Sequence, residues 1–266
     1  MSTPSSSTVA KAFRVLELFR HHRYITVRIC QEALGLPRAT AHRLLVSLRE
    51  VGAVENTGDG HYRLSIALFE LGALAPLRRS LGDRAGNEIE SLADNTGCRV
   101  HLAILREHNV LFIEAAHGRQ ARAQGYRTRV GYRGPLHATA IGKVLLAYAP
   151  SEVQRRELAQ PLAPFTHRTV CDPAILAEQL REIRITGHTF TVGEYVLGVS
   201  SLAVPLADGE GQVRAAISVV GPGHYMERRR HQLLSEAQVA ARRITRGDGA
   251  TLRQRTVGDD ALVVSR

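Results

Sequence analysis

The chain has 266 residues, of which 44% are hydrophobic, and this suits one large or two ordinary folded domains. Its formal net charge of +10 favours a polyanionic partner. The three cysteines lack metal-like spacing, the N-terminus is polar, and no apolar run approaches the ~18 residues of a spanning helix. We therefore expect a cytoplasmic protein with reduced thiols, without a disulfide scaffold, secretory leader or membrane span.

The N-terminal residues predict two short helices after a polar tail. Residues 1–8 are rich in serine and threonine, and we expect them to be disordered. Apolar residues at helical spacing then predict a first helix, with Val9 and Phe13 on its apolar stripe. Thr26 is positioned to cap a second helix, and Gly35 supplies the turn after it. Helices joined by such a turn are typical of a helix-turn-helix.

Residues 36–54, LPRATAHRLLVSLREVGAV, predict a third helix that organises this part of the chain. Ala41, Leu44, Leu45 and Leu48 make one apolar stripe. The opposite arc is small, polar and basic, as in a helix whose N-terminal half enters a DNA major groove. An ordinary amphipathic surface helix is the competing interpretation, so the sequence on either side decides between them.

A β-hairpin is predicted directly after this helix. Short strands at 54–55 and 61–64 flank the glycine-rich turn 57–60. The order helix, helix, turn, helix, hairpin favours a winged helix-turn-helix over a solvated hairpin without a DNA-binding role. We predict that the following residues contact bases or phosphates: Lys11, Arg38, Ala39, Thr40, His42, Arg43, His61 and Arg63.

A helix should connect this domain to the rest of the chain. Ser65 is positioned to cap it, and Pro76 should kink or end it. We interpret residues 65–80 as this linker helix, and a separate helix is predicted at 84–95.

The remainder alternates between strand and helix patterns. The predicted elements are a hairpin at 100–116, helices at 139–148, 151–158 and 173–185, three strands within 188–223, and a closing helix at 226–244. Hairpins with helices packed on them predict an α+β fold with a mostly antiparallel sheet. The predicted organisation is a disordered tail at 1–8, a winged helix-turn-helix at 9–64, a linker helix at 65–80, a second domain at 81–246 and a disordered tail at 247–266.

Four sequence blocks, spread over residues 9–243, resemble the IclR family of bacterial transcriptional regulators. They are KAFRVLELF with LGLPRATAHRLLVSLREVGAVE, then HYRLSIALFELG, then GPLHATAIGKVLLA, and finally REIRITGHTFTVGEYVLGVSSLAVPL with AAISVVGP. Each block is short, but four in order at the family's spacing form a specific signal.

The resemblance implies a winged helix-turn-helix joined by a helix to a GAF-like effector-binding domain. It implies homodimers, often homotetramers, on inverted-repeat operators of double-stranded DNA. A small metabolite, commonly an organic acid, would alter DNA binding or contact with RNA polymerase. Repressors and activators share this architecture.

The resemblance also places the effector site. The family's pocket positions correspond here to Ala123, Tyr126, Ala140, Ile141, Thr191, Val199, Ser201, Ser218 and Val220. This chain departs from the family at three of them, because Thr191 replaces an acid, Ser201 a cysteine and Val220 a serine. We therefore expect a ligand different from that of members with the usual set, held by the hydroxyls of Thr191 and Ser201.

Other polar residues of the second domain are interpreted as structural. His137 is expected to cap the helix at 139–148, with Lys143 structural or solvated. A role of these two residues as ligand contacts is the less favoured alternative. The arginine-rich stretch 119–133 is interpreted as a solvated face rather than an attractor of anions, and His101 as an ordinary polar residue.

Enzymatic activity is not expected. Ser200 and Ser201, with Glu194 nearby, lack the flanking glycines of a G-x-S-x-G elbow. The sequence also lacks H-E-x-x-H, P-loop and G-x-G-x-x-G motifs, and we expect no metal and no cofactor. A DNA-binding protein that needs no ligand remains an alternative, although the long second domain exceeds what that role requires.

Overall fold

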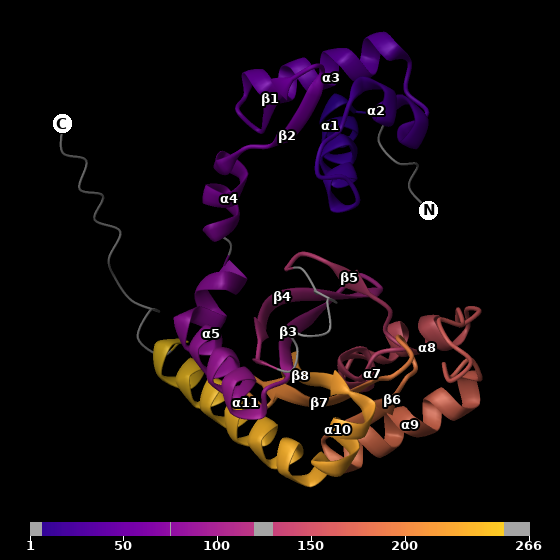
Figure 1. The fold of residues 1–266 in the computed structure, drawn as a ribbon, viewed down its shortest axis with the longest axis vertical. Helices are drawn as coiled ribbons and strands as arrows, with labels where there is room; N and C mark the ends of the chain where they lie inside the picture. The colour runs from indigo at the N-terminus through magenta and orange to yellow at the C-terminus, as the bar shows by residue number, and fades with distance from the viewer. Residues whose placement is uncertain (1–6, 75, 120–129, 253–266) are drawn as a thin grey trace, which may run out of the picture. The chain divides into compact units, whose positions relative to one another are not determined.

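The computed structural model describes residues 7–74, 76–119 and 130–252, and its chain divides into two compact units, Met1–Ser80 and Leu81–Arg266 (Figure 1). The fold class is α+β, as predicted, with an N-terminal helical unit and a C-terminal antiparallel sheet covered by helices. Within the described residues, no helix is both long and apolar enough to cross a membrane.

Three helices form the core of the first unit. Val15, Cys30 and Leu45 are buried at its centre. Thr26 caps the second helix through its hydroxyl, and Gly35 ends that helix in the left-handed region at φ 65°. The helices are α1 (Thr8–Glu17), extended by the 3-10 turn η1 (Leu18–Arg20), α2 (Val27–Leu34) and α3 (Arg38–Glu50).

The beginning of the chain differs from the prediction. The Ser7 hydroxyl accepts a hydrogen bond from the Ala10 amide and caps α1, so this residue belongs to the folded unit rather than to a tail. Val9 and Phe13 of the predicted apolar stripe are exposed, and Val15 is fully buried. The other members of that stripe, Ala12, Leu16 and Phe19, are half-buried against the core as the helical spacing predicts.

A two-stranded hairpin follows α3. Strands β1 (Val54–Gly58) and β2 (His61–Leu64) pair antiparallel, and β1 is longer than predicted. Tyr62 is buried, and its backbone exchanges two hydrogen bonds with Ile25 in the loop before α2, at 2.9 and 3.0 Å. These bonds attach the hairpin to the helical core.

The predicted linker helix is interrupted. Helix α4 (Ile66–Ala73) ends well before Ser80, and α5 (Pro76–Thr96) absorbs the separate helix predicted at 84–95. Pro76 explains the change, because proline lacks an N–H but is favourable in the first turn of a helix. Pro76 therefore begins a helix here instead of ending one.

The second unit is built on one six-stranded sheet in the order β5-β4-β3-β8-β7-β6, with antiparallel pairing throughout. The hairpin predicted at 100–116 is its β3–β4 pair. The strands are β3 (Arg99–Arg106), β4 (Asn109–His117), β5 (Arg133–Gly134), β6 (Thr189–Val192), β7 (Val199–Ala207) and β8 (Val213–Pro222).

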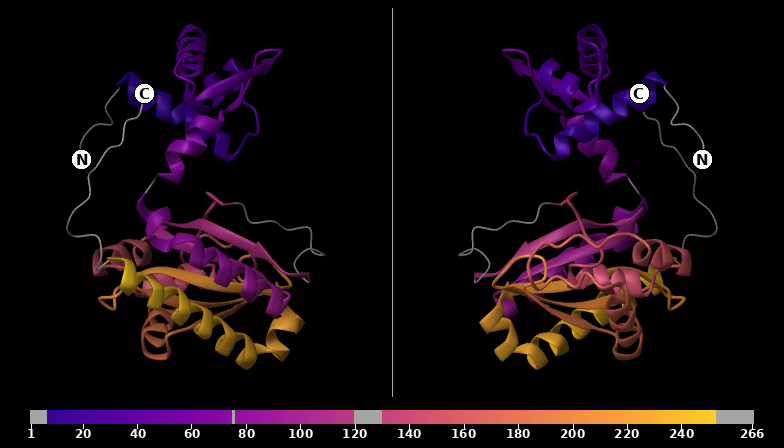
Figure 2. Two further views of the ribbon diagram at one scale, coloured as in Figure 1. Left: turned by 90° about the vertical axis from the view of Figure 1, so that its left-hand side faces the viewer. Right: turned by 90° about the vertical axis from the view of Figure 1, so that its right-hand side faces the viewer.

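Helices cover both faces of this sheet. One face packs against α5, α10 (Gly223–Arg228) and α11 (Arg230–Leu252), and α5 and α11 run side by side in Figure 2. The other face packs against α7 (Ala140–Ala147) and α9 (Pro173–Thr186), with α8 (Ser151–Leu158) beside them. Alternate residues of β3, β7 and β8 therefore belong to two different cores.

The C-terminal end also differs from the prediction. The single closing helix expected at 226–244 is the pair α10 and α11, and α11 continues to Leu252. Residues 247–252 are therefore helical rather than disordered, because extending a formed helix costs far less than starting one. Residues 253–266, the rest of that predicted tail, lie outside the described residues.

Candidate functional site

Helix α3 carries five of the eight residues that were predicted to contact DNA; four of them are exposed, and Thr40 is half-buried. Ala39, His42 and Arg43 are exposed, opposite the buried stripe that begins at Ala41. Arg38 is exposed at the first position of the helix, after Pro37 at the N-cap. The start of α3 thus offers backbone N–H groups that the helix leaves free, and the exposed guanidinium groups of Arg38 and Arg43 lie within its first two turns. Such groups suit contact with phosphate and base edges.

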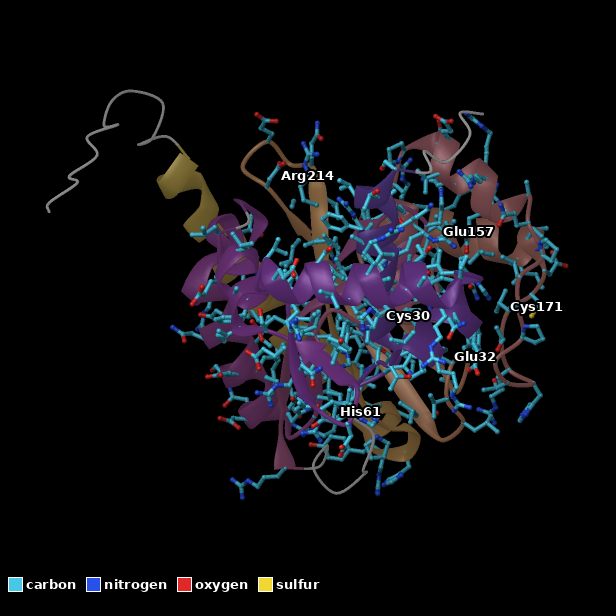
Figure 3. All side chains as sticks on the ribbon, turned by 90° about the horizontal axis from the view of Figure 1, so that it is seen from above. Cys30, Glu32, His61, Glu157, Cys171 and Arg214 are labelled. Carbon is cyan, nitrogen blue, oxygen red and sulfur yellow. The ribbon has the colours of Figure 1, made fainter. Side chains whose placement is uncertain are left out.

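The hairpin and α1 carry the other predicted DNA contacts. His61 is exposed on β2 (labelled in Figure 3), with its ring edge-on to Tyr24 at 6.4 Å between centroids. Arg63 is exposed but already pairs with Glu55 of β1 at 2.7 Å. A phosphate would therefore compete with this carboxylate for Arg63. Lys11 is half-buried on α1.

The second unit contains a cavity between the sheet and the segment that leads into α7. Its volume is about 60 Å³, whereas roughly 10–15 Å³ is enough to admit one water molecule. Strands β3, β4, β6, β7 and β8 contribute to it, together with the start of α7 and the β6–β7 loop. It is lined by His101, Phe112, Ala138, Thr139, Ile141, Thr191, Glu194, Tyr195, Val196, Val199, Ser201, Ser218 and Val220.

The cavity gathers six of the nine predicted effector positions, namely Ile141, Thr191, Val199, Ser201, Ser218 and Val220. Ala140 is buried at the start of α7 but does not line the cavity. Ala123 and Tyr126 lie outside the described residues. The Thr191 hydroxyl, predicted to hold a ligand, lies 3.5 Å from the Ser201 carbonyl oxygen, a long contact for a hydrogen bond.

The sequence prediction missed the polar residue at the floor of the cavity. His101 was interpreted as an ordinary polar residue, yet it is buried on β3 and faces the cavity. Burial, with Arg99 and His117 nearby, lowers the pKa of His101 to about 3, so its ring is neutral at pH 7. Alternation along β3 was the available signal, because His101 shares a face with Ala103 and points away from Val100 and Leu102.

Two polar atoms on this floor have no hydrogen-bond partner among the described residues: His101 Nε2 and Ser218 Oγ. Their residues lie directly opposite each other across the β3–β8 pair. A buried group left without a partner costs roughly 1–3 kcal/mol of stability. Such groups are rare in folded proteins and call for a physical reason.

The wall of the cavity is held by a buried ion pair. Lys143 Nζ of α7 lies 2.7 Å from both carboxylate oxygens of Glu194 and 2.8 Å from Gln179 Oε1 of α9. Lys143 is therefore buried and structural, as one of the two predicted alternatives had it. Burial lowers the pKa of Lys143, while Glu194 opposes that shift. The Thr169 hydroxyl also donates to the Glu194 carbonyl at 2.6 Å, so Glu194 is fixed from both sides.

The segment ahead of α7 is fixed by Thr139 rather than by His137. The Thr139 hydroxyl accepts a hydrogen bond from the Gly142 amide at 3.1 Å and caps α7, which corrects the prediction for His137. A side chain at Gly142 would lie 2.5 Å from the Leu136 carbonyl oxygen, so glycine allows this close approach. His137 instead contacts Ala163 O at 3.0 Å and Glu157 of α8, labelled in Figure 3, at 3.5 Å.

Aromatic side chains link two walls of the cavity. The Tyr132 and Tyr195 hydroxyls lie 2.9 Å apart and join the strand β5 region to the β6–β7 loop. Phe112 packs edge-on against the His101 ring, with centroids 5.1 Å apart, and stacks on Tyr132 at 6.2 Å. The cavity thus has an apolar body and a polar floor, which is the usual composition of a small-molecule site.

The charge of the lining is simple. Of the described residues that line the cavity, Glu194 is the one Asp, Glu, Lys or Arg, and Lys143 pairs with it. Within the described part of the chain, no group of three or more His, Cys, Asp or Glu side chains is arranged to hold a metal ion. Cys171, labelled in Figure 3, is exposed ahead of α9.

Comparison with known proteins identifies the class. The sequence profile of the IclR helix-turn-helix domain matches residues 8–58, and that of the C-terminal domain of bacterial transcriptional regulator IclR matches residues 77–246. The HTH-type transcriptional regulator BhcR of Paracoccus denitrificans is 32% identical over 88% of this chain and 84% of its own length. The regulator KdgR of Dickeya chrysanthemi is 31% identical over 91% of this chain and 79% of its own length.

Solved structures agree. A crystal structure of an IclR homologue from Microbacterium hydrocarbonoxydans, complexed with 4-hydroxybenzoate, covers 92% of this chain and 99% of that one with a TM-score of 0.81 and 31% identity. The crystal structure of a regulator of the same family from Silicibacter covers 91% of this chain and 96% of that one, with a TM-score of 0.79 and 28% identity. Fold and comparisons together define a helix-turn-helix regulator of transcription that binds DNA. The chain belongs to the IclR family of bacterial transcriptional regulators.

Proposed function

We propose that this protein is a sequence-specific transcriptional regulator whose operator binding is controlled by a small molecule in the cavity of the second unit. Residues 9–64 are the DNA-binding part in this proposal, 65–80 the linker, and 81–246 the effector-binding part. The observation that carries it is the cavity itself, with an apolar body and two buried polar groups lacking partners on its floor. The complex of a homologue with 4-hydroxybenzoate supports effector binding in this family.

The DNA-reading surface is assigned to the start of α3. Arg43 is the candidate for a guanine contact, because its planar fork matches O6 and N7 of that base. It is exposed and has no ion-pair partner among the described residues. Arg38, Thr40 and His42 flank it on the same end of the helix. An inverted-repeat operator would require a dimer, in which each copy reads one half-site.

Fluorescence anisotropy with the purified protein tests the DNA part. The intergenic DNA beside its own gene is compared with an unrelated duplex of equal length at the same salt concentration. Preference for the intergenic duplex is expected, whereas equal binding to both would contradict specific recognition. Arg43→Ala should weaken operator binding by ~1–3 kcal/mol and relax the base preference at one position. Arg49→Ala, at the exposed far end of α3, is the control and should leave the base preference intact.

The effector part is tested on the same complex. Small organic acids and alcohols are added to the protein–operator complex, and a change in anisotropy identifies a compound that alters binding. The change should weaken in Ile141→Phe, which fills the cavity from α7, and remain in Leu105→Phe, a half-buried position outside the lining. A compound whose effect survives the filled cavity would act elsewhere. A protein that binds its operator and responds to no compound would favour a ligand-independent regulator.

A further inference from the structure

The floor of the cavity carries two hydrogen-bonding groups whose partners the described protein does not supply. His101 and Ser218 face each other across β3 and β8, and side chains in this relation have Cβ atoms about 4.5–5.5 Å apart. Both residues are buried, at 4% and 1% exposure, and both line the cavity. His101 Nε2 and Ser218 Oγ are each without a partner among the described residues. One ligand atom placed between them could bond to both.

The protonation state of His101 limits which functional group of a ligand can bond to both side chains. The lowered pKa of His101 keeps its ring neutral, so Nε2 either donates or accepts a single hydrogen bond. A hydroxyl suits either tautomer. It can donate to Nε2 and accept from Ser218, or accept from Nε2–H and donate to the serine oxygen. A carboxylate can only accept, and would bring its charge into a cavity that is already lined by the acidic side chain of Glu194.

We propose that His101 and Ser218 together recognise a hydroxyl group of the effector, and that they select hydroxyl-bearing compounds over analogues of the same shape that lack it. The inference rests on the proposed function, because it assigns a chemistry to the same cavity. The preference for hydroxylated compounds follows from the burial of both side chains. A compound without the hydroxyl leaves both groups desolvated and unpaired, whereas the hydroxylated compound satisfies them. The small volume beside the floor suits one end of a ligand, with an apolar portion against Phe112 and Val220.

The sheet provides a matched control. Ser200 on β7 is 1% exposed and its Oγ also has no partner among the described residues. It lies on the opposite face of the sheet, near Gly223 at the start of α10, and does not line the cavity. Ser200→Ala and Ser218→Ala each remove one buried hydroxyl without a partner. Neither change should unfold the protein, so a difference between them in ligand binding reports on the cavity.

The experiment is isothermal titration calorimetry on the full-length protein with paired probes. The pairs are 4-hydroxybenzoate with benzoate and glycolate with acetate, each differing by one hydroxyl. In the wild type, the hydroxylated member of at least one pair should bind roughly 10- to 100-fold more tightly than its partner. Ser218→Ala should bring that ratio close to one, as should His101→Phe, which keeps a ring and removes its nitrogens. Ser200→Ala should retain the wild-type ratio.

Two results would overturn the proposal. The first is an affinity ratio near one for both probe pairs in the wild type, and the absence of binding by either hydroxylated probe at millimolar concentration counts as this result. The second is an affinity ratio that Ser218→Ala leaves unchanged. Operator anisotropy with the same probes separates this inference from the proposed function. If benzoate or acetate alters operator binding as strongly as its hydroxylated partner, the result supports regulation by a small molecule and contradicts hydroxyl recognition. If calorimetry shows the preference for the hydroxylated probe while no probe alters operator binding, the result supports hydroxyl recognition and contradicts regulation of operator binding by these compounds.

Discussion

The two faces of the six-stranded sheet are built from the same strands but are stabilised differently. The face against α5 and α11 is packed with aliphatic side chains such as Leu102, Ile217 and Val219. The face against α7 combines apolar contacts with polar groups: the Lys143–Glu194 ion pair and the unpaired groups of the cavity floor. Apolar contacts need no particular geometry, because the hydrophobic effect is non-directional. Buried polar groups are stable only when a hydrogen-bond partner lies at the right distance and direction. The first face therefore mainly maintains the fold, and the second carries the polar groups on which the proposed ligand recognition depends.

The largest effect should come from separating the buried ion pair. Lys143→Met leaves the Glu194 carboxylate buried without its cation, and we expect a loss of about 3–5 kcal/mol in the free energy of unfolding. Urea denaturation followed by circular dichroism measures it. The added change Glu194→Gln should restore much of the loss, because it removes the uncompensated charge.

An exposed ion pair serves as the comparison for that result. Arg181 and Glu178 pair on α9, and both side chains are 69% exposed. Arg181→Ala should change the free energy of unfolding by no more than about 1 kcal/mol. If Lys143→Met cost as little as Arg181→Ala, charge would not be what holds the cavity face together.

Two consecutive valines of β8 compare the faces directly. Val219 is fully buried in the packed face, and Val220 lines the cavity. Val219→Ala should cost about 2–3 kcal/mol in the free energy of unfolding, because it removes buried methyl groups and leaves a new void. Val220→Ala only enlarges a void that exists already and should cost about 1 kcal/mol. Equal costs in urea denaturation would show that the cavity face is packed as tightly as the other.

These faces also explain what sequence alone could predict. Asp172 and Gly187 fix the two ends of α9 through their nearest neighbours, so this helix was predicted to within a residue. The bounds of α7 were also predicted to within a residue, although its cap was assigned to His137 and is Thr139. The ion pair could not be found in this way, since Lys143 and Glu194 are 51 positions apart and meet only after the sheet and α7 have packed. Local sequence patterns predict helix caps and turns, but they do not predict ion pairs between residues that only the tertiary structure brings together.

The cavity shows the same limit within a single strand. Six of its positions were inferred from the family resemblance, but His101 was not. Alternation along β3 separates the His101 face from the Leu102 face, yet both faces are buried and the sequence does not show which of them borders a cavity. The interrupted linker has a similar cause. Pro76 can end a helix or begin one, and only the packed structure shows that it begins α5.

The neutral histidine predicts a loss of stability in mild acid. The pKa of His101 is about 3 in the folded state and about 6.5 in the unfolded chain. Between these values the unfolded state binds one more proton, so this group removes stability as the pH falls, by about 1.4 kcal/mol per pH unit. From pH 6.5 to 5 the contribution is about 2 kcal/mol. His101→Phe should lose that part of the pH dependence in urea titrations, and an unchanged slope would contradict a neutral buried ring.

The smallest effect, of opposite sign, should come from His137 on the same side of the sheet. Burial by itself lowers the pKa of His137, but hydrogen bonds to Glu157 and Ala163 outweigh it and raise the pKa above its ordinary value. A raised folded pKa contributes stability below the unfolded pKa of about 6.5 and loses it as the pH rises through the folded value. His137→Gln, which can still donate to the Ala163 carbonyl, should therefore differ most from the wild type below pH 6.5 and least in alkali. If the difference grew with pH instead, the Glu157 contact would not be a pair with a protonated ring, and α8 would be anchored to the α7 entry by neutral hydrogen bonds alone.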